Sequence, residues 1–182
     1  MKRMALGRDS QKRWAVFISG TGSNLGALLD LRSEVDIRLV ISSSKKALGL
    51  LKARRSGVPT LVLDRPINWK QLLEKLNQYS INAIFLAGFM KVVPAEFIKN
   101  FSGLILNLHP SLLPEYPGLE SIKRAYEDQA NMGCTIHHVV PEVDAGPIIR
   151  QKKTSRYNSL EDSEFAVHIA EQSLVREVVL RC

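Results

Sequence analysis

The chain has 182 residues, of which 45% are hydrophobic and 24% charged, and this composition is typical of a globular protein with one domain. No apolar run approaches the roughly 20 residues that a membrane-spanning helix needs, and charges interrupt the start of the chain where an export signal would lie, so we expect a cytoplasmic protein without a membrane partner. The formal net charge is +7, but the lysines and arginines are scattered without interleaved aromatic residues, so we expect no nucleic-acid partner.

We expect residues 1–13 to form a loose basic leader and residues 14–182 to form a single domain. The first apolar run, 14–19, has the length of a strand and no polar interruption, which is typical of a central strand covered on both faces. The polar, glycine-containing stretch 20–24 follows, and leucines then recur at helical spacing. The glycines are therefore predicted to lie in a turn between a strand and a helix.

The glycine turn is suited to bind an anion. A backbone without Cβ atoms can approach a ligand closely, and the free N–H groups at a helix start favour a phosphate, which we expect at Gly22, Ser23 and Asn24. The glycine spacing is one residue longer than the dinucleotide-binding pattern, and Ser42 and Ser43 end the second strand in place of an acid. NAD is therefore disfavoured, while NADP and a turn without any ligand stay open as alternatives.

Short apolar runs and helical patterns alternate along the rest of the chain. The expected strands cover residues 36–42, 59–63, 82–87, 104–108, 133–140 and 148–157, and the expected helices cover 45–56, 69–79, 95–100, 119–129 and 160–180. This alternation predicts an α/β, Rossmann-like, doubly wound and mostly parallel sheet with an antiparallel C-terminal strand. The crossover rule places the first, fourth and fifth strands centrally, and Ser159 and Asp162 have the spacing of a capping box for the last helix.

The fifth strand is predicted to end in polar groups. Asn107 and His109 are two residues apart, so their side chains point to the same side of the strand. Open α/β sheets bind ligands at the carboxyl ends of their strands, which makes this pair a candidate active site. From these residues alone, a turn-capping asparagine and a structural histidine are the more common interpretation. Cys134 and Cys182 have no metal-ligand spacing, so we expect free thiols and no metal.

Four motifs occur in the same order as in the folate-dependent formyltransferases. They cover residues 19–25, 86–90 and 107–118, and His137 together with the segment 144–147. From about Trp14 to its end the chain resembles this family, and its glycine turn is similar to that of the phosphoribosylglycinamide formyltransferase branch. Methionyl-tRNA formyltransferases resemble it less at that turn and carry an additional domain. Formyltetrahydrofolate deformylases share the turn but usually carry a regulatory domain in front.

The resemblance implies transfer of a formyl group from 10-formyltetrahydrofolate, as co-substrate, to the amine of glycinamide ribonucleotide in purine biosynthesis. Hydrolysis of formyltetrahydrofolate and transfer to another amine are the alternatives, and a non-catalytic domain is a remote one. We expect small-molecule partners and a monomer or weak homodimer.

The resemblance also implies residue roles. Asn107 and a protonated His109 would donate hydrogen bonds to the oxyanion, and Asp144 would hold the His109 ring. The phosphate would bind at the glycine turn, and Glu171 would contact the ribose. The folate would lie against Met90, Lys91, Val92, Val93, Val140, Pro141, Glu142 and Val143. His137 and Gly118 would line the site, His138 would pack elsewhere, and His168 would lie at the surface or the substrate edge.

The chain departs from the family at positions near the substrates. Lys91 replaces an arginine that helps to hold the folate tail, Glu115 stands where lysine is common, and Glu120 with Ser121 replaces a pair that contains histidine. Lysine lacks the planar fork that suits a carboxylate, which predicts weaker folate binding. The departures leave the catalytic trio intact and lie near the substrates, so transfer to another amine stays open as an alternative.

Overall fold

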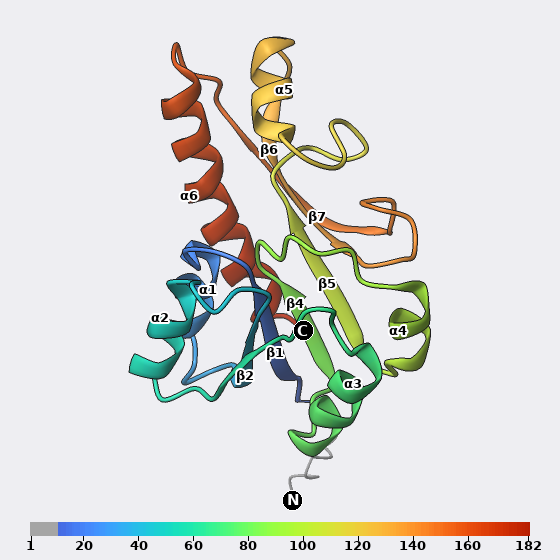
Figure 1. Ribbon diagram of the computed structural model, residues 1–182. Coiled ribbons are helices and arrows are strands. Elements are labelled where there is room, and N and C mark those ends of the chain that lie inside the picture. The colour runs from blue at the N-terminus through green and yellow to red at the C-terminus, as the bar shows by residue number, and fades with distance from the viewer. Residues whose placement is uncertain (1–10) are drawn as a thin grey trace, which may run out of the picture.

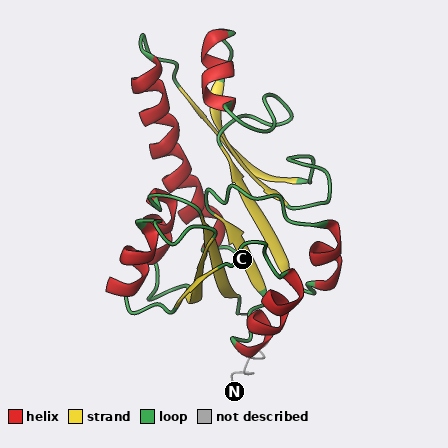
Figure 2. Cartoon of the chain, in the orientation of Figure 1, coloured by secondary structure: helices red, strands yellow, loops and turns green. Residues whose placement is uncertain are grey.

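The computed structural model describes residues 11–182, with helices and strands alternating along the chain (Figures 1 and 2). The strands are β1 (Arg13–Ile18), β2 (Asp36–Ser42), β3 (Thr60–Val62), β4 (Ala83–Leu86), β5 (Leu104–His109), β6 (Met132–His138) and β7 (Ile148–Thr154). The helices are α1 (Ser23–Leu29), α2 (Gly49–Arg55), α3 (Trp69–Gln78), α4 (Ala95–Asn100), α5 (Ser121–Glu127) and α6 (Leu160–Val179). Most of the expected leader lies outside the described residues, but Arg13 belongs to β1.

The strands form one sheet in the order β3-β2-β1-β4-β5-β6-β7. Strands β1 to β5 are parallel, β6 is antiparallel to β5, and β7 is antiparallel to β6. The predicted mostly parallel sheet, its three central strands and its antiparallel C-terminal strand are therefore confirmed. Because the strand order reverses between β1 and β4, this point of the sheet is where an open α/β fold leaves a crevice for a ligand.

Helices cover both faces of the sheet (Figure 1). Along β1 alternate side chains point to opposite faces, so Trp14, Val16 and Ile18 pack with residues of α1, α2 and α6, while Ala15 and Phe17 pack with residues of α3 and α4. Each large apolar side chain buried in this way contributes about 1.5–3 kcal/mol. This double cover explains why β1 is apolar throughout, as expected for a central strand.

The prediction that the second helix begins near residue 45 is wrong, because α2 begins at Gly49. Serine side chains hold the preceding backbone in a turn: Ser42 Oγ accepts a hydrogen bond from Ser44 N at 3.1 Å, and Ser44 Oγ accepts one from Lys46 N at 3.3 Å. Such local bonds offer the backbone an alternative to the helix. The helix ends as predicted, with Gly57 just beyond it in the left-handed region (φ 70°).

Helix α6 begins with the predicted capping bond, in which Ser159 Oγ accepts from Asp162 N at 3.0 Å. Of its apolar residues Val175 and Val178 are buried, whereas Phe165 and Ile169 are exposed. Both cysteines of the chain are free thiols, as predicted. Within residues 11–182, no helix has the length and apolar character needed to cross a membrane.

Candidate active site

A cleft of about 710 Å³ opens at the carboxyl ends of β1, β4 and β5. This volume lies within the range of small-molecule sites. Every residue that the sequence analysis assigned to the site lines this cleft: Gly22, Ser23, Asn24, Met90, Lys91, Val92, Val93, Asn107, His109, Gly118, His137, Val140, Pro141, Glu142, Val143, Asp144 and Glu171. The structure thus brings together segments from nearly the whole chain, while the roles of these residues stay predictions.

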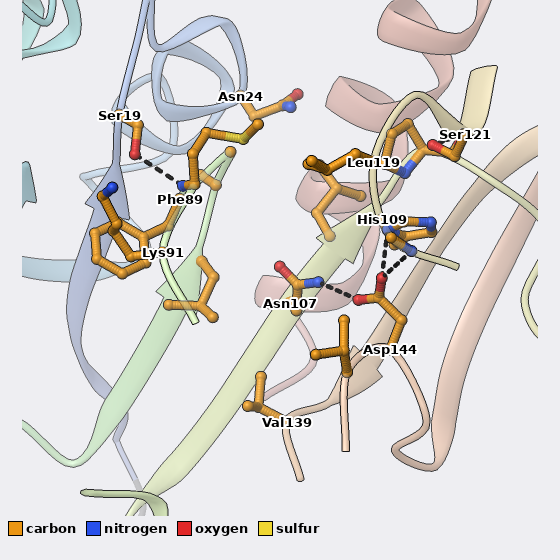
Figure 3. Close-up of a pocket in the computed structure, with 18 of the residues that line it drawn as sticks. Ser19, Asn24, Phe89, Lys91, Asn107, His109, Leu119, Ser121, Val139 and Asp144 are labelled. Carbon is orange, nitrogen blue, oxygen red and sulfur yellow. Dashed lines mark hydrogen bonds and ion pairs between the residues drawn. The ribbon is translucent and has the colours of Figure 1, made fainter. Parts of the chain in front are cut away.

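The cleft has two walls (Figure 3). Ser19, Phe89 and Lys91 lie on one side, and His109 and Asp144 lie on the other. Asn107 projects from β5 between them. A ligand in the cleft would therefore contact the loop after β4 on one side and the polar cluster on the other.

Asp144 is the centre of the polar cluster. Its Oδ2 lies 3.2 Å from His109 Nδ1 and accepts a hydrogen bond from Gly118 N at 2.8 Å, while its Oδ1 accepts one from Asn107 Nδ2 at 3.2 Å. The backbone of Asp144 is in the left-handed region (φ 53°), which is uncommon for a residue other than glycine. This turn aims the carboxylate back toward the end of β5.

The surroundings favour the ionised form of Asp144. Burial works to raise the pKa of this carboxyl group, but contact with the His137 ring, the hydrogen bond from Gly118 N and the attraction of His109 outweigh burial and lower it. Asp144 is therefore an anion at neutral pH. An anion at this position can hold a protonated imidazole and fix its orientation.

Both ring nitrogens of His109 face hydrogen-bond acceptors. Nδ1 faces the Asp144 carboxylate, and Nε2 lies 2.9 Å from the main-chain oxygen of Tyr116. A carbonyl oxygen only accepts, so Nε2 carries a hydrogen, and Nδ1 needs one to bond the carboxylate. This arrangement therefore suits the doubly protonated ring that the family resemblance implied for an oxyanion donor.

The amide of Asn107 is oriented by two neighbours. Its Nδ2 donates to Asp144 and lies 3.1 Å from His137 Nε2, while His137 Nδ1 donates to the main-chain oxygen of His138 at 2.8 Å. His137 Nε2 thus lies beside both Asn107 Nδ2 and Asp144 Oδ1, at 3.1 Å and 3.5 Å. Since both amide hydrogens face protein atoms, Oδ1 is the atom of Asn107 that points into the space between the walls (Figure 3).

A second polar cluster lies at the glycine-turn end of the cleft. Asn24 Nδ2 donates to Glu171 Oε2 at 3.1 Å, and His168 Nδ1 lies 2.9 Å from the same oxygen. Asn24 and Glu171 are both more than nine-tenths buried. Glu171 is therefore not a solvated position on α6 but a buried residue of the cleft. Asn24 Oδ1 is buried and has no hydrogen-bond partner among residues 11–182.

The glycine turn is supported from α2. Gly22 has a φ of 68°, and its main-chain oxygen accepts a hydrogen bond from Lys52 Nζ at 3.1 Å. Gly49, the first residue of α2, donates through its N–H to the oxygen of Gly20 at 3.2 Å. Neither Lys52 nor Gly49 was predicted to contribute, because nothing in a single sequence indicates which helix packs behind the turn.

Apolar side chains line the cleft on both sides. Met90 and Val92 are exposed in the loop after β4 and Val143 is exposed next to Asp144, while Val93 is buried in the core. Val92 is therefore not part of the core. The loop is tied to the end of β1, because Met90 N donates to Ser19 Oγ at 2.8 Å and Ser19 Oγ lies 2.7 Å from Ser43 Oγ.

Ser19, His138 and His168 were given no role in binding or catalysis from the sequence. Ser19 belongs to a motif that the sequence shares with the formyltransferases, but its link to the loop after β4 depends on contacts across the sheet. His168 lies on the cleft, as expected for a residue at the substrate edge. His138 is exposed, so the prediction that it packs in the interior is wrong: it follows buried His137 in β6 and therefore points to the other face.

Comparison with known proteins identifies relatives over most of the chain. The family model described as formyl transferase matches residues 12–179. The phosphoribosylglycinamide formyltransferase of Escherichia coli is 33% identical over 168 residues, which cover 86% of this chain and 79% of that protein. The human trifunctional purine biosynthetic protein adenosine-3 is 41% identical over 152 residues, but the chain spans only 15% of its length.

A solved structure is similar to this chain in both sequence and fold. The phosphoribosylglycinamide formyltransferase of Anaplasma phagocytophilum is 38% identical and superposes with a TM-score of 0.86, over 92% of this chain and 84% of the other.

Proposed function

The chain belongs to the formyl transferase family, and on that premise we propose that it transfers a formyl group from 10-formyltetrahydrofolate to the amine of glycinamide ribonucleotide, a step of de novo purine biosynthesis. One observation carries the proposal. The cluster of Asn107, His109 and Asp144 lies in a single cleft, between a glycine turn that suits a phosphate and an apolar wall that suits a flat aromatic ring. The Escherichia coli relative of similar length bears the name of this activity.

The reaction exchanges one C–N bond for another at the formyl carbon, and one proton passes from the attacking amine to the departing folate nitrogen. Negative charge develops on the formyl oxygen during the exchange. His109, held by Asp144, is the donor best suited to that oxygen, and one such donor is worth roughly 3 kcal/mol. The Nε2 hydrogen of His109 already faces the oxygen of Tyr116. The formyl oxygen must therefore either share this hydrogen with the Tyr116 oxygen or displace that oxygen.

The orientation of Asn107 suggests a role that differs from the one we expected. The family resemblance implied that Asn107 donates to the oxyanion, but both amide hydrogens face Asp144 and His137. Its Oδ1, which points into the cleft, is placed to accept a hydrogen bond from the attacking amine (Figure 3). We therefore assign Asn107 to orienting the amine, and His109 to stabilising the charge.

The glycine-turn end of the cleft supports the nucleotide part of the proposal. Buried polar atoms in proteins nearly always have a partner, so the unpartnered Oδ1 of Asn24 calls for a donor from the ligand. The carboxylate of Glu171 beside it also accepts only. A ribose, whose hydroxyls donate, satisfies both residues, while the main chain at Gly22 and Ser23 would hold the phosphate.

The other end supports the folate part. Met90, Val92 and Val143 expose apolar surface to the cleft, which suits a pterin ring, and the segment 140–143 lies on the same lining. Lys91 would face the acidic tail of the folate as a point charge. A cytoplasmic location, where both small-molecule substrates are made, is part of the proposal, as is the absence of a metal from the reaction.

The test is the disappearance of the formyl absorbance of 10-formyltetrahydrofolate with purified protein. Transfer predicts loss of formyl only when glycinamide ribonucleotide is present, whereas hydrolysis predicts the same loss without it. Replacing His109 with alanine should abolish turnover while leaving ribonucleotide binding, measured by calorimetry, largely intact. No loss of formyl under either condition, or full activity of His109→Ala, contradicts the proposal.

A further inference from the structure

One short segment contacts two members of the polar cluster. The main-chain oxygen of Tyr116 accepts from His109 Nε2 at 2.9 Å, and two residues later Gly118 N donates to Asp144 Oδ2 at 2.8 Å. Tyr116 and Gly118 both have positive φ values, of 53° and 80°. This backbone conformation is costly for tyrosine, so it persists only where other contacts hold it.

Those contacts come from α5. Arg124 donates through Nη2 to the oxygen of Pro117, and its guanidinium carbon lies 5.8 Å from the centre of the Tyr116 ring. One turn further along, Asp128 Oδ2 accepts a hydrogen bond from the Tyr116 hydroxyl at 3.0 Å. Two residues at the end of one helix therefore hold the side chain and the main chain of the segment 116–118.

We propose that Arg124 is a positioning residue for the transfer reaction: from α5 it fixes the segment 116–118, and through that segment it fixes His109 and Asp144. The residue touches neither substrate in the proposed arrangement. It acts by keeping the Tyr116 oxygen in line with His109 Nε2 and the Gly118 N–H in line with Asp144. The inference rests on the function proposed above.

Arg124 acts on the segment through Nη2. Its Nε is buried and has no hydrogen-bond partner among residues 11–182, whereas Nη2 bonds the oxygen of Pro117. Lys123 next to it on α5 is half-exposed, and its one ion pair within the described part of the chain is with Glu127, at 3.9 Å. The two neighbours share charge and helix but not the contact with the segment, so Lys123 provides a matched control.

The experiment compares Arg124→Met, Arg124→Lys and Lys123→Met with the unchanged protein. Methionine keeps an apolar stem over the Tyr116 ring but removes the donor and the charge. Because misplacement of a reacting group by about 1 Å can cost roughly 100-fold in rate, we expect kcat of Arg124→Met to fall by about 10- to 100-fold with both KM values changed less than about threefold. Arg124→Lys should recover part of the loss, and Lys123→Met should behave like the unchanged protein.

A readout that does not need turnover separates this inference from the proposed function. The imidazole N–H of His109 that is bonded to Tyr116 should give a protected proton resonance, which is identified by its absence in His109→Gln. We expect it to remain in Lys123→Met and to disappear in Arg124→Met, while thermal unfolding shows both variants folded. If Arg124→Met keeps the resonance and the full kcat, or loses activity only in proportion to unfolded protein, the positioning role is wrong. If the unchanged protein shows the resonance but no transfer, the proposed function fails and the positioning of His109 stands.

Discussion

Asn24 on α1 and Glu171 on α6 are 147 positions apart in the chain, yet the amide of one donates to the carboxylate of the other over 3.1 Å. The contact closes the glycine-turn end of the cleft with two buried side chains. It also commits the amide nitrogen of Asn24 to the protein, so that the amide oxygen is left for a ligand. The polarity of this end of the cleft therefore follows from a pairing between the first and last helices.

The first prediction concerns the charge of Glu171 at the glycine-turn end of the cleft. Glu171→Gln keeps the size of the side chain but loses the ionised acceptor, and a hydrogen bond to a charged group is worth about 1.5–3 kcal/mol. We expect the KM for glycinamide ribonucleotide to rise roughly 10- to 100-fold, with the KM for the folate unchanged. Glu177→Gln, on the same helix but outside the cleft, is the control and should leave both KM values as they are.

The second prediction concerns pH. The hydrogen bond with Glu171 raises the pKa of His168, against partial desolvation, and the charges of Glu171 and Glu164 raise it further. A raised pKa means that the stabilisation is complete below the unfolded value of about 6.5 and is lost as pH rises through the higher folded value. His168 is half-exposed, so solvent screening limits the effect to about 1 kcal/mol or less. The free energies of unfolding in urea of the unchanged protein and of His168→Gln should be alike above that folded pKa and should differ below it. A constant difference at all pH values contradicts the assignment.

The third prediction also concerns the dependence of stability on pH, but here stability is lost as pH falls. The pKa of Asp144 is lowered on balance, so its stabilisation is present above the unfolded value of about 3.9 and is lost as pH falls through the folded value. In Asp144→Asn the free energy of unfolding should therefore fall less steeply below pH 4 than in the unchanged protein. At neutral pH the same variant should lose about 100-fold or more in kcat, because His109 loses the anion that holds it. Circular dichroism against pH and steady-state kinetics provide the two measurements.

The fourth prediction concerns the loop after β4. Ser19→Ala removes the acceptor for Met90 N, and one neutral hydrogen bond contributes about 0.5–1.5 kcal/mol. We expect the KM for the folate to rise roughly 2- to 10-fold while the KM for the ribonucleotide stays the same. Ser43→Ala removes only the second partner of Ser19 and should have the smaller effect. Equal effects of the two variants on both substrates would show that the link does not position the folate loop.

Periodicity was sufficient to predict the framework of this fold. The parallel strands are short apolar runs separated by helices, so the central position of β1, β4 and β5 follows from pattern and crossover geometry. The start of α2 was misplaced because serine side chains bind the backbone ahead of it, an effect that hydrophobic spacing does not report. The alternation of side chains on β5 likewise placed Asn107 and His109 together.

The remaining parts of the site depend on contacts between distant segments. That Asp144 reaches His109 depends on a left-handed residue in a loop 35 positions away, and the sequence could suggest it only through the family resemblance. The Tyr116 oxygen acts through the main chain, which carries no residue signature. Arg124 and Lys52 look like ordinary solvated charges on helices until the packing of α5 and α2 is known.

The fifth prediction tests the close approach between the glycine turn and α2. A Cβ on Gly22 would lie 2.8 Å from Gly49 Cα, and the φ of 68° disfavours any other residue, so Gly22→Ala should lower the free energy of unfolding by about 1–3 kcal/mol. Because the turn must also shift away from α2, we expect ribonucleotide binding to weaken more than folate binding. Gly26→Ala is the matched control: it lies inside α1, a Cβ there meets nothing within 4 Å, and alanine should stabilise the helix by about 0.5–1 kcal/mol. Urea unfolding and calorimetric titration with the ribonucleotide measure both effects, and a stable Gly22→Ala protein with unchanged ribonucleotide affinity would show that the conformation of the turn does not control that end of the cleft.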